Sequence, residues 1–349
     1  MKKITTDIII TINTMINPTE HIADQFGRIH DYLRISLTER CNLRCFYCMP
    51  EDGIVLSEKS NLMSHEEVIA IAQQFVQLGV KKIRLTGGEP LLKKNIEKII
   101  EELSQLPISL GITTNGILLE KYIDLFNKCG VKDINISLDT LNKEKFEQIT
   151  RRDYFDRVLS NIDLYEKNGF NVKINNVIIK GTNDDEIADF IAFTKNRNIA
   201  IRFIEFMPFD GNKWNTEKII TLDDILKVAK ERFSEENINT LKSKKNGTAK
   251  NFRINGFKGE FGVISTVSNP FCDSCNRIRL TANGRIKNCL FSSTETDLLT
   301  PLRNGENIAE HIKKGILHKF KVRGGMETNE DFFNEDNFTK NRNMTTIGG

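Results

Sequence analysis

Short segments of alternating apolar and polar residues follow helical segments from residue 31 to about residue 207. This pattern predicts six strands, at 32–38, 82–86, 108–114, 133–138, 171–179 and 200–206. Apolar residues at helical spacing predict helices between them, at 64–78, 94–104, 118–128, 156–168 and 184–197. About six βα repeats predict an α/β protein whose parallel sheet is either curved into part of a barrel or doubly wound.

The predicted strands are unusual for a parallel sheet, because buried parallel strands normally read as continuous apolar runs. Here Ile83 and Leu85 alternate with Lys82 and Arg84, and the other strands show the same pattern. If helices cover the apolar faces, the polar faces share an interior, which favours a ligand-holding barrel over a filled one. An antiparallel sheet with one wet face is the alternative. The predicted interior is cationic and suits a phosphate-bearing ligand, because it contains Arg34, Lys82, Arg84 and Lys173.

Three cysteines, Cys41, Cys45 and Cys48, follow the first predicted strand with the spacing C-x3-C-x2-C. A structural zinc site or a fully ligated iron–sulfur cluster needs four protein ligands. Three ligands leave one iron of a four-iron cluster open to a small molecule. The five histidines offer no close fourth ligand, so zinc is the weaker interpretation of this loop.

A second incomplete group consists of Cys272, Cys275 and Cys289. A structural zinc knuckle is the alternative here, and spacing alone favours it. However, Arg277 and Arg279 follow within four residues of Cys275, and paired guanidiniums suit a phosphate-bearing ligand rather than a structural metal. Seven cysteines in two tight clusters and one single position argue for metal sites in a reducing, cytoplasmic compartment rather than for disulfides.

Composition adds a few limits. The 349 residues carry a net charge of only +3, which gives no indication of nucleic acid as a partner. No apolar run reaches the roughly 18 residues that a membrane-spanning helix needs. Residues 1–22 form an extension of unassigned role, and the polar composition of 327–349 predicts a mobile tail.

The second predicted strand ends in Thr86-Gly87-Gly88-Glu89-Pro90, where glycines let a ligand approach the backbone closely. A C-x3-C-x2-C loop followed by such a strand end resembles the radical S-adenosylmethionine (SAM) superfamily. The resemblance implies a partial (β/α)6 TIM-like barrel, with SAM bound to the open iron and cleaved to a 5′-deoxyadenosyl radical. It also implies a C-terminal domain that carries a second Fe–S cluster.

Several longer runs narrow the resemblance to the family of GTP 3′,8-cyclases of molybdenum cofactor biosynthesis. They include K-K-I-R-L-T-G-G-E-P, T-T-N-G, R-F-I-E-F-M, F-C-D-S-C-N-R-I-R-L-T-A-N-G and the terminal I-G-G, and the similarity covers residues 25–349. The family implies two [4Fe-4S] clusters, on the triads Cys41, Cys45, Cys48 and Cys272, Cys275, Cys289. It implies SAM contacts at Tyr47, Gly88, Ser137 and Met207, and GTP contacts at Arg34, Arg84, Thr113, Lys173, Arg277 and Arg279. Arg277, Arg279, Gly348 and Gly349 are implied to shape the hydrogen-abstraction step, so the tail becomes functional.

The implied activity is conversion of GTP to (8S)-3′,8-cyclo-7,8-dihydroguanosine 5′-triphosphate by a radical SAM lyase. The implied partners are an electron donor and, functionally, the next enzyme of the pathway, with the chain a monomer or homodimer. The predicted domains are 1–22, a barrel at 23–212, an auxiliary-cluster domain at 213–326 and a tail at 327–349. A radical SAM enzyme acting on a peptide, and a zinc-stabilised nucleotide-binding module without catalysis, are the alternatives.

Overall fold

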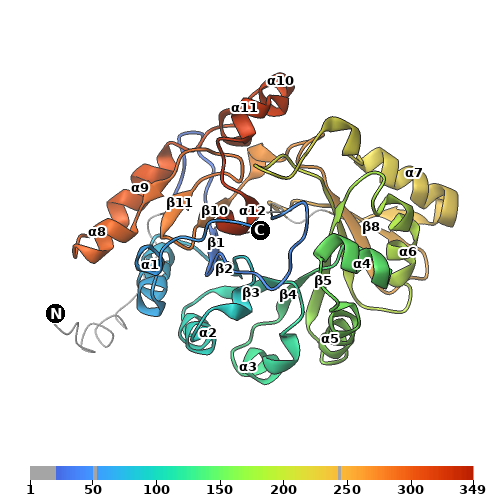
Figure 1. Cartoon of the computed structure of the whole chain (residues 1–349), viewed down its shortest axis with the longest axis horizontal. Coiled ribbons are helices and arrows are strands. Elements are labelled where there is room, and N and C mark those ends of the chain that lie inside the picture. Colours follow the sequence, from blue (N-terminus) through green and yellow to red (C-terminus); the bar gives the residue numbers. More distant parts are fainter. Residues whose placement is uncertain (1–20, 50–52, 243–244, 349) are drawn as a thin grey trace.

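The computed structural model describes residues 21–49, 53–242 and 245–348. Six parallel strands form the centre of one curved sheet (Figure 1). Their bounds are β1 (Tyr32–Ser36), β2 (Lys82–Thr86), β3 (Ser109–Thr114), β4 (Asp133–Ser137), β5 (Asn171–Ile178) and β6 (Ala200–Glu205). All six lie where the apolar alternation predicts them, and their pairing in chain order confirms the parallel sheet.

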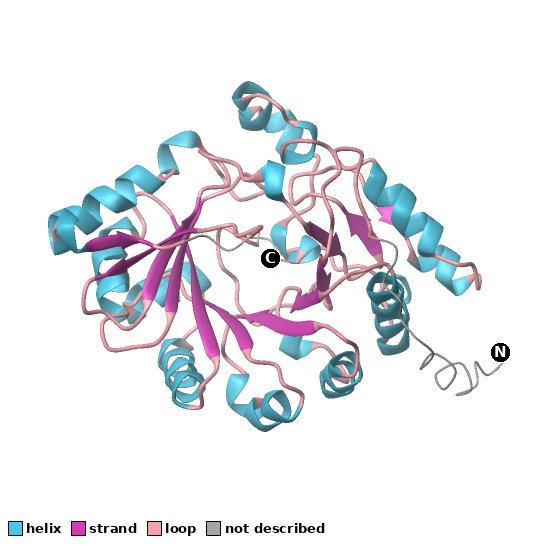
Figure 2. Cartoon of the chain, turned by 180° about the vertical axis from the view of Figure 1, so that it is seen from behind, coloured by secondary structure: helices cyan, strands magenta, loops and turns pink. Residues whose placement is uncertain are grey.

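Helices lie outside this curved sheet, and its strands enclose a central region (Figure 2). They are α1 (His65–Gln77), α2 (Ile96–Ser104), α3 (Ile123–Lys128), α4 (Lys143–Thr150), α5 (Phe155–Lys167) and α6 (Ile187–Phe193). Ser64 and Glu67 form a capping box at the start of α1. The sequence pattern missed α4, because most of its residues are charged or polar and only Phe146, Ile149 and Thr150 are buried.

The C-terminal strands extend the same sheet at both edges. Strand β10 (Arg277–Leu280) pairs in parallel with β1, and β9 (Glu260–Ile264) pairs in parallel with β6. The remaining strands are β7 (Ile238–Thr240), β8 (Lys250–Ile254), β11 (Arg285–Lys287) and β12 (Thr296–Asp297), and β8 pairs antiparallel with β9. The predicted domain boundary near residue 212 therefore falls within one continuous sheet, and it stays a prediction.

The main apolar core lies between the outer face of the sheet and its helices, as the strand pattern predicts. The C-terminal helices are α7 (Leu222–Phe233), α8 (Leu299–Arg303), α9 (Ala309–Leu317), α10 (Asn329–Phe333), α11 (Glu335–Phe338) and α12 (Met344–Ile347). Within the described ranges, no helix combines the length and apolar character needed to cross a bilayer.

The tail packs on the molecule, so the prediction of mobility from composition was wrong. A second apolar cluster anchors it and consists of Phe209, Val267, Phe291, Met326, Phe332 and Ile347. Phe332 and Ile347 have exposed fractions of 0% and 1%. A few apolar side chains are enough to anchor this polar segment, because each of them packs against apolar residues of the rest of the chain.

Candidate functional site

The first triad lies in the loop after β1, at the carboxyl ends of the parallel strands. The backbone N–H groups of Arg44 and Phe46 donate to the carbonyl oxygens of Thr150 and Ile149, at distances of 2.9 and 3.1 Å. These bonds attach the loop to the end of α4. A cysteine loop held on a rigid helix presents its thiols in one place, as a bound cluster requires.

The three cysteines are half-buried, and their thiols lie close enough to influence one another's pKa. Burial raises the pKa of Cys48 to about 12, and neighbouring Cys41 and Asp139 raise it further. Burial also raises the pKa of Cys45 well above its usual value, with further contributions from Asp139 and the other two thiols. Thiolates here therefore need a bound cation, which fits an iron–sulfur cluster. No three His, Cys, Asp or Glu side chains in the described ranges are grouped as ligands of a single metal ion.

The two glycines that end β2 make room for the cysteine loop. A Cβ on Gly88 would lie 2.4 Å from the carbonyl oxygen of Arg40, and one on Gly87 would lie 2.6 Å from that of Thr38. The N–H of Gly88 donates to the carbonyl oxygen of Thr38 at 2.7 Å. The side-chain space at both glycines is thus occupied by backbone of the cysteine loop, whereas the sequence argument gave that space to a ligand.

Glu89, the acidic residue of the same strand end, ties β3 to this loop. Its carboxylate accepts hydrogen bonds from Thr114 Oγ1 at 2.8 Å and from the Asn115 N–H at 2.7 Å. Asn115 Nδ2 in turn donates to Asn42 Oδ1 at 2.6 Å and lies 3.9 Å from Cys41 Sγ. Burial raises the pKa of Glu89 to about 7, although these donors partly offset the shift.

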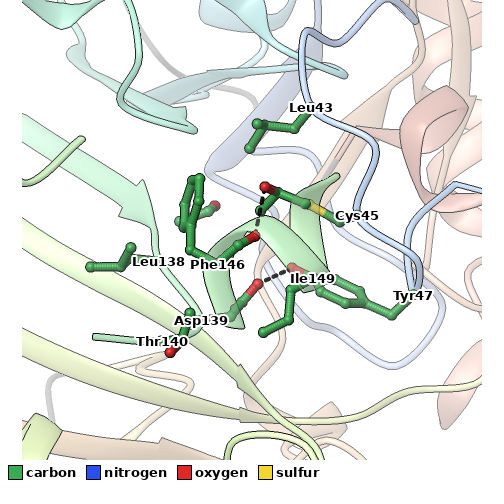
Figure 3. A pocket seen from close by; sticks show the side chains of 10 residues that line it. Leu43, Cys45, Tyr47, Leu138, Asp139, Thr140, Phe146 and Ile149 are labelled. Atoms are coloured by element: carbon green, nitrogen blue, oxygen red, sulfur yellow. Dashed lines mark hydrogen bonds between the residues drawn. The ribbon is translucent and has the colours of Figure 1, made fainter. Parts of the chain in front are cut away.

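Tyr47 and Ser137, two predicted SAM contacts, line one small pocket beside Cys45 (Figure 3). Tyr47 Oη donates to Asp139 Oδ2 at 2.5 Å, and Asp139 Oδ1 accepts from the Val177 N–H at 2.8 Å. Burial raises the pKa of Asp139 to about 6. Met207, another predicted contact, follows β6 at the same end of the sheet. The four predicted SAM residues and the first triad therefore lie at the same end of the sheet, where the parallel strands have their carboxyl ends.

Gly88→Ala is expected to prevent assembly of the first cluster. The added methyl group would overlap loop backbone, and overpacking of this kind costs about 1–3 kcal/mol or forces the loop to move. We expect the variant to fold, to retain iron at the second triad, and to form no 5′-deoxyadenosine. Gly130→Ala is the control, because a Cβ there meets no atom within 4 Å. Normal iron content and SAM cleavage in Gly88→Ala would contradict the packing argument.

The second triad lies at the other end of the sheet. Cys275 precedes β10, and Cys289 follows β11, which runs antiparallel to β10 with Arg279 opposite Lys287. Cys272 Sγ accepts a hydrogen bond from the Arg323 N–H at 3.5 Å. Strands β10 and β1 are parallel. The second triad therefore lies at the amino ends of this strand pair, and the first triad lies at its carboxyl ends. A five-residue strand rises roughly 16 Å, so a small ligand between the strands can extend from one triad toward the other.

The predicted cationic residues meet inside the barrel. Burial and the charge of Arg84 lower the pKa of Arg202 on β6 to about 10. The charge of Arg34 on β1 also lowers this pKa. Strands β6 and β1 are separated by four strands in the sheet, so these side chains interact only because the sheet curves around its polar face. Burial lowers the pKa of Arg279 to about 9, with a further contribution from Arg34.

Other inward-facing groups balance some of this charge. Lys82 Nζ lies 3.4 Å from Asp133 Oδ2, so this lysine is partly neutralised. Arg84 Nε donates to Tyr32 Oη at 2.8 Å. Burial raises the pKa of Tyr32, but Arg84, Arg34 and Lys82 outweigh burial and lower it to about 8. A phenol that ionises more easily than usual, despite its burial, indicates a positive potential in this interior.

Several buried polar atoms of the interior have no partner among the described residues. They include Ser36 Oγ, Thr113 Oγ1, Asn135 Oδ1, Asn175 Oδ1 and one terminal nitrogen of Arg277. Lys173 shares the inward face with two of them, because Asn135 is its register partner on β4. Buried polar groups are nearly always hydrogen-bonded, so these atoms fit a bound polar molecule.

The C-terminal tail reaches this interior at Gly348, just after α12, which Figure 1 shows near the centre of the molecule. Arg279 donates to the carbonyl oxygen of Gly348. A Cβ on Gly348 would lie 2.7 Å from Thr86 Oγ1 and 2.8 Å from Ser36 Cβ. The penultimate glycine therefore contacts β1, β2 and a predicted GTP ligand, while Gly349 lies outside the described residues.

Sequence reasoning missed Arg202, Tyr32 and Lys319 as members of the site. Arg202 occupies an inward position on β6 next to Asn175 on β5, so the alternation that identified Arg84 was also available for Arg202. Tyr32 Oη bonds Arg84, and Lys319 lies 3.4 Å from Cys275 Sγ. No local pattern marks Lys319, because it reaches the triad only through the fold.

Comparison with known proteins agrees with this geometry. Residues 35–194 match the radical SAM superfamily, and 199–324 match the family described as Molybdenum Cofactor Synthesis C. GTP 3′,8-cyclase of Listeria welshimeri is 41% identical over 94% of this chain and 99% of its own length. The chain belongs to the GTP 3′,8-cyclase family. Membership in this radical SAM family confirms the predicted fold class and the predicted use of SAM and iron–sulfur chemistry.

Further members of the GTP 3′,8-cyclase family differ in length. The mitochondrial GTP 3′,8-cyclase of Arabidopsis thaliana is 46% identical over 95% of this chain and 85% of its own length. Molybdenum cofactor biosynthesis protein 1 of Dictyostelium discoideum is also 46% identical, over 94% of this chain. The chain spans about half the length of that relative, 52%. Among solved structures, SAM-bound SuiB of Streptococcus suis has a TM-score of 0.58 at 15% identity, covering 84% of this chain and 69% of its own, which shows the shared fold.

Proposed function

We propose that this chain converts GTP into (8S)-3′,8-cyclo-7,8-dihydroguanosine 5′-triphosphate, the first step of molybdenum cofactor biosynthesis. The observation that carries the proposal is the position of two three-cysteine sites at opposite ends of one cationic interior. One site suits a SAM-binding cluster and the other suits a cluster that holds the substrate. Family membership supports the same conclusion.

The first triad would hold a four-iron cluster, and this cluster with SAM would supply a hydrogen-abstracting radical by one-electron cleavage of the sulfonium. Tyr47 and Ser137 line a pocket beside Cys45, and Gly88 packs against the cysteine loop. With Met207, which follows β6 at the same end of the sheet, they would orient SAM. The part-buried Tyr47–Asp139 hydrogen bond would hold the Tyr47 ring beside this triad.

The second triad would hold a four-iron cluster that binds the guanine. Arg34, Arg84, Thr113 and Lys173 would bind the rest of GTP, with Arg277 and Arg279 beside the second cluster. Guanidiniums form bidentate bonds with phosphates, and a bound polyanion would relieve their mutual repulsion. Such fixed groups bring ribose C3′ and purine C8 together for bond formation.

The remaining assignments belong to this proposal. The free state of all seven cysteines suits a reducing, cytoplasmic compartment. An electron donor and the next enzyme of the pathway would be the protein partners. The boundaries at 22, 212 and 326 would separate the extension, the barrel, the auxiliary-cluster region and the tail.

The direct test is anaerobic reconstitution with iron and sulfide, followed by incubation with SAM, GTP and a reductant. Two four-iron clusters predict about eight iron atoms per chain. We expect 5′-deoxyadenosine to form only when GTP is present, together with the cyclised nucleotide. Zinc at the second triad, equal deoxyadenosine formation without GTP, or absence of a cyclised product would contradict the proposal.

Arg202→Met is expected to weaken GTP binding. Loss of one charge-assisted contact to phosphate costs about 1.4–3 kcal/mol, which corresponds to a rise in the GTP KM of roughly tenfold or more. Arg253→Met is the matched control, because Arg253 is an exposed arginine of β8. Steady-state kinetics with saturating SAM measure the effect. An unchanged KM for GTP in Arg202→Met would remove this residue from the substrate site.

A further inference from the structure

Lys319 is a buried lysine that the proposed function leaves without a role. It lies just after α9, and its exposed fraction is 3%. Its Nζ donates to the carbonyl oxygen of Arg277 at 2.7 Å and lies 3.4 Å from Cys275 Sγ. One ammonium group therefore contacts both a predicted cluster ligand and the first residue of β10.

The contacts of Lys319 include no carboxylate among the residues that the structure describes. The buried Asp24 carboxylate nearby bonds Arg28 Nε at 2.6 Å and His30 Nε2 at 3.0 Å, so its charge is already balanced. A buried ammonium without a counter-anion costs several kcal/mol. The sulfur of Cys275 is the group in contact with Lys319 that becomes anionic when it binds a metal.

The surrounding contacts keep this ammonium in place. Burial, followed by the charge of Lys319, lowers the pKa of His30 to about 4, so this histidine is a neutral ring within the field of the lysine. Arg28 donates to the carbonyl oxygens of Cys272 and Lys321 at 2.9 and 2.8 Å. The segment before β1 thus joins the second cysteine loop to the segment that carries Lys319.

We propose that Lys319 is a positioning residue that compensates the negative charge of the second triad and raises the reduction potential of the cluster bound there. The inference rests on the iron–sulfur assignment of the proposed function. Charge and hydrogen bonds near the sulfurs are principal determinants of cluster potential.

The test uses protein in which Cys41, Cys45 and Cys48 are replaced by Ala, so that iron binds at the second triad alone. The midpoint potential of that cluster is measured by redox titration followed by electron paramagnetic resonance. Lys319→Met removes the charge and Lys319→Arg keeps it. Lys321→Met is the matched control, because Lys321 is two residues away and exposed.

In Lys319→Met we expect the ratio of reduced to oxidised cluster at a fixed potential to fall about tenfold or more, equivalent to about 59 mV for one electron. Lys319→Arg and Lys321→Met should stay within about threefold of the parent. A parental potential in Lys319→Met would overturn the role of Lys319 while leaving the proposed function intact. Absence of iron from the second triad of the parent would overturn both.

A second measurement applies if Lys319→Met loses its cluster. In metal-free protein the lysine has no anion beside it, so its removal should leave the Tm unchanged or raise it. A lower Tm of metal-free Lys319→Met would indicate a purely structural lysine and would contradict the proposal. Loss of the cluster without loss of Tm supports charge compensation.

Discussion

Cys289→Ser is expected to abolish GTP cyclisation while leaving the first cluster in place. Cys289 follows β11 at the second triad, on the opposite side of the barrel interior from Cys41, Cys45 and Cys48. Two ligands hold a four-iron cluster poorly, so iron should fall from about eight to about four atoms per chain. The cyclised product should fall at least 100-fold, because the purine would no longer be fixed relative to the ribose.

The control for this prediction is Cys129→Ser, since Cys129 is a half-buried free thiol packed at the edge of the main core, apart from both triads. It should keep its iron and its activity. Iron analysis and product quantification by mass spectrometry distinguish the two variants. Full cyclisation by Cys289→Ser would show that the second triad has no part in the reaction.

Gly348→Ala is the second change for which we expect a large effect. Gly348 has a φ of +84°. A Cβ at this position would lie less than 3 Å from atoms of Thr86 and Ser36. Its carbonyl also accepts a hydrogen bond from Arg279. A methyl group must displace the tail from the interior or strain it there. Because small displacements of groups in a reactive site can cost about 100-fold, we expect a drop of that size in product formation.

Gly305→Ala separates this effect from backbone strain. Gly305 has a similar φ of +78°, but a Cβ there meets no atom within 4 Å. Both substitutions carry the cost of about 1–2 kcal/mol for a left-handed alanine, and only one creates a clash. The Tm of Gly305→Ala measures the cost of the left-handed alanine alone, and kcat should fall only in Gly348→Ala. Equal activity in the two variants would contradict a role for the tail in the site.

The sequence predicted the barrel because its signal is periodic. Alternation along β1 to β5 distinguished the inward face from the outward face, and the structure confirms the shared cationic interior. The helix α4 was missed because its buried residues, Phe146, Ile149 and Thr150, are too few to give a clear period. The pairing of β10 with β1 was also beyond the pattern, since these strands lie more than 240 residues apart and pair only in the folded chain.

Local sequence motifs identified the predicted cluster ligands, but they did not identify the residues that contact those ligands. The two triads were evident from spacing, but the contact between Lys319 and Cys275 joins positions 44 residues apart. Glycines 87 and 88 were singled out for a ligand, and the structure adds another reason for them, because they accommodate the backbone of the cysteine loop. The SAM contact at Gly88 stays a prediction. The polar composition of the tail predicted mobility, whereas its anchors Phe332 and Ile347 are isolated residues with no period.

The central claim is that both ends of one cationic interior act on a single nucleotide. The most direct test records the electron paramagnetic resonance spectrum of the second cluster, in protein whose first triad is replaced by Ala, before and after addition of GTP. The account predicts a changed spectrum with GTP and an unchanged spectrum with inorganic triphosphate, because only the purine would reach the open iron. A spectrum that GTP leaves unaltered would contradict the claim.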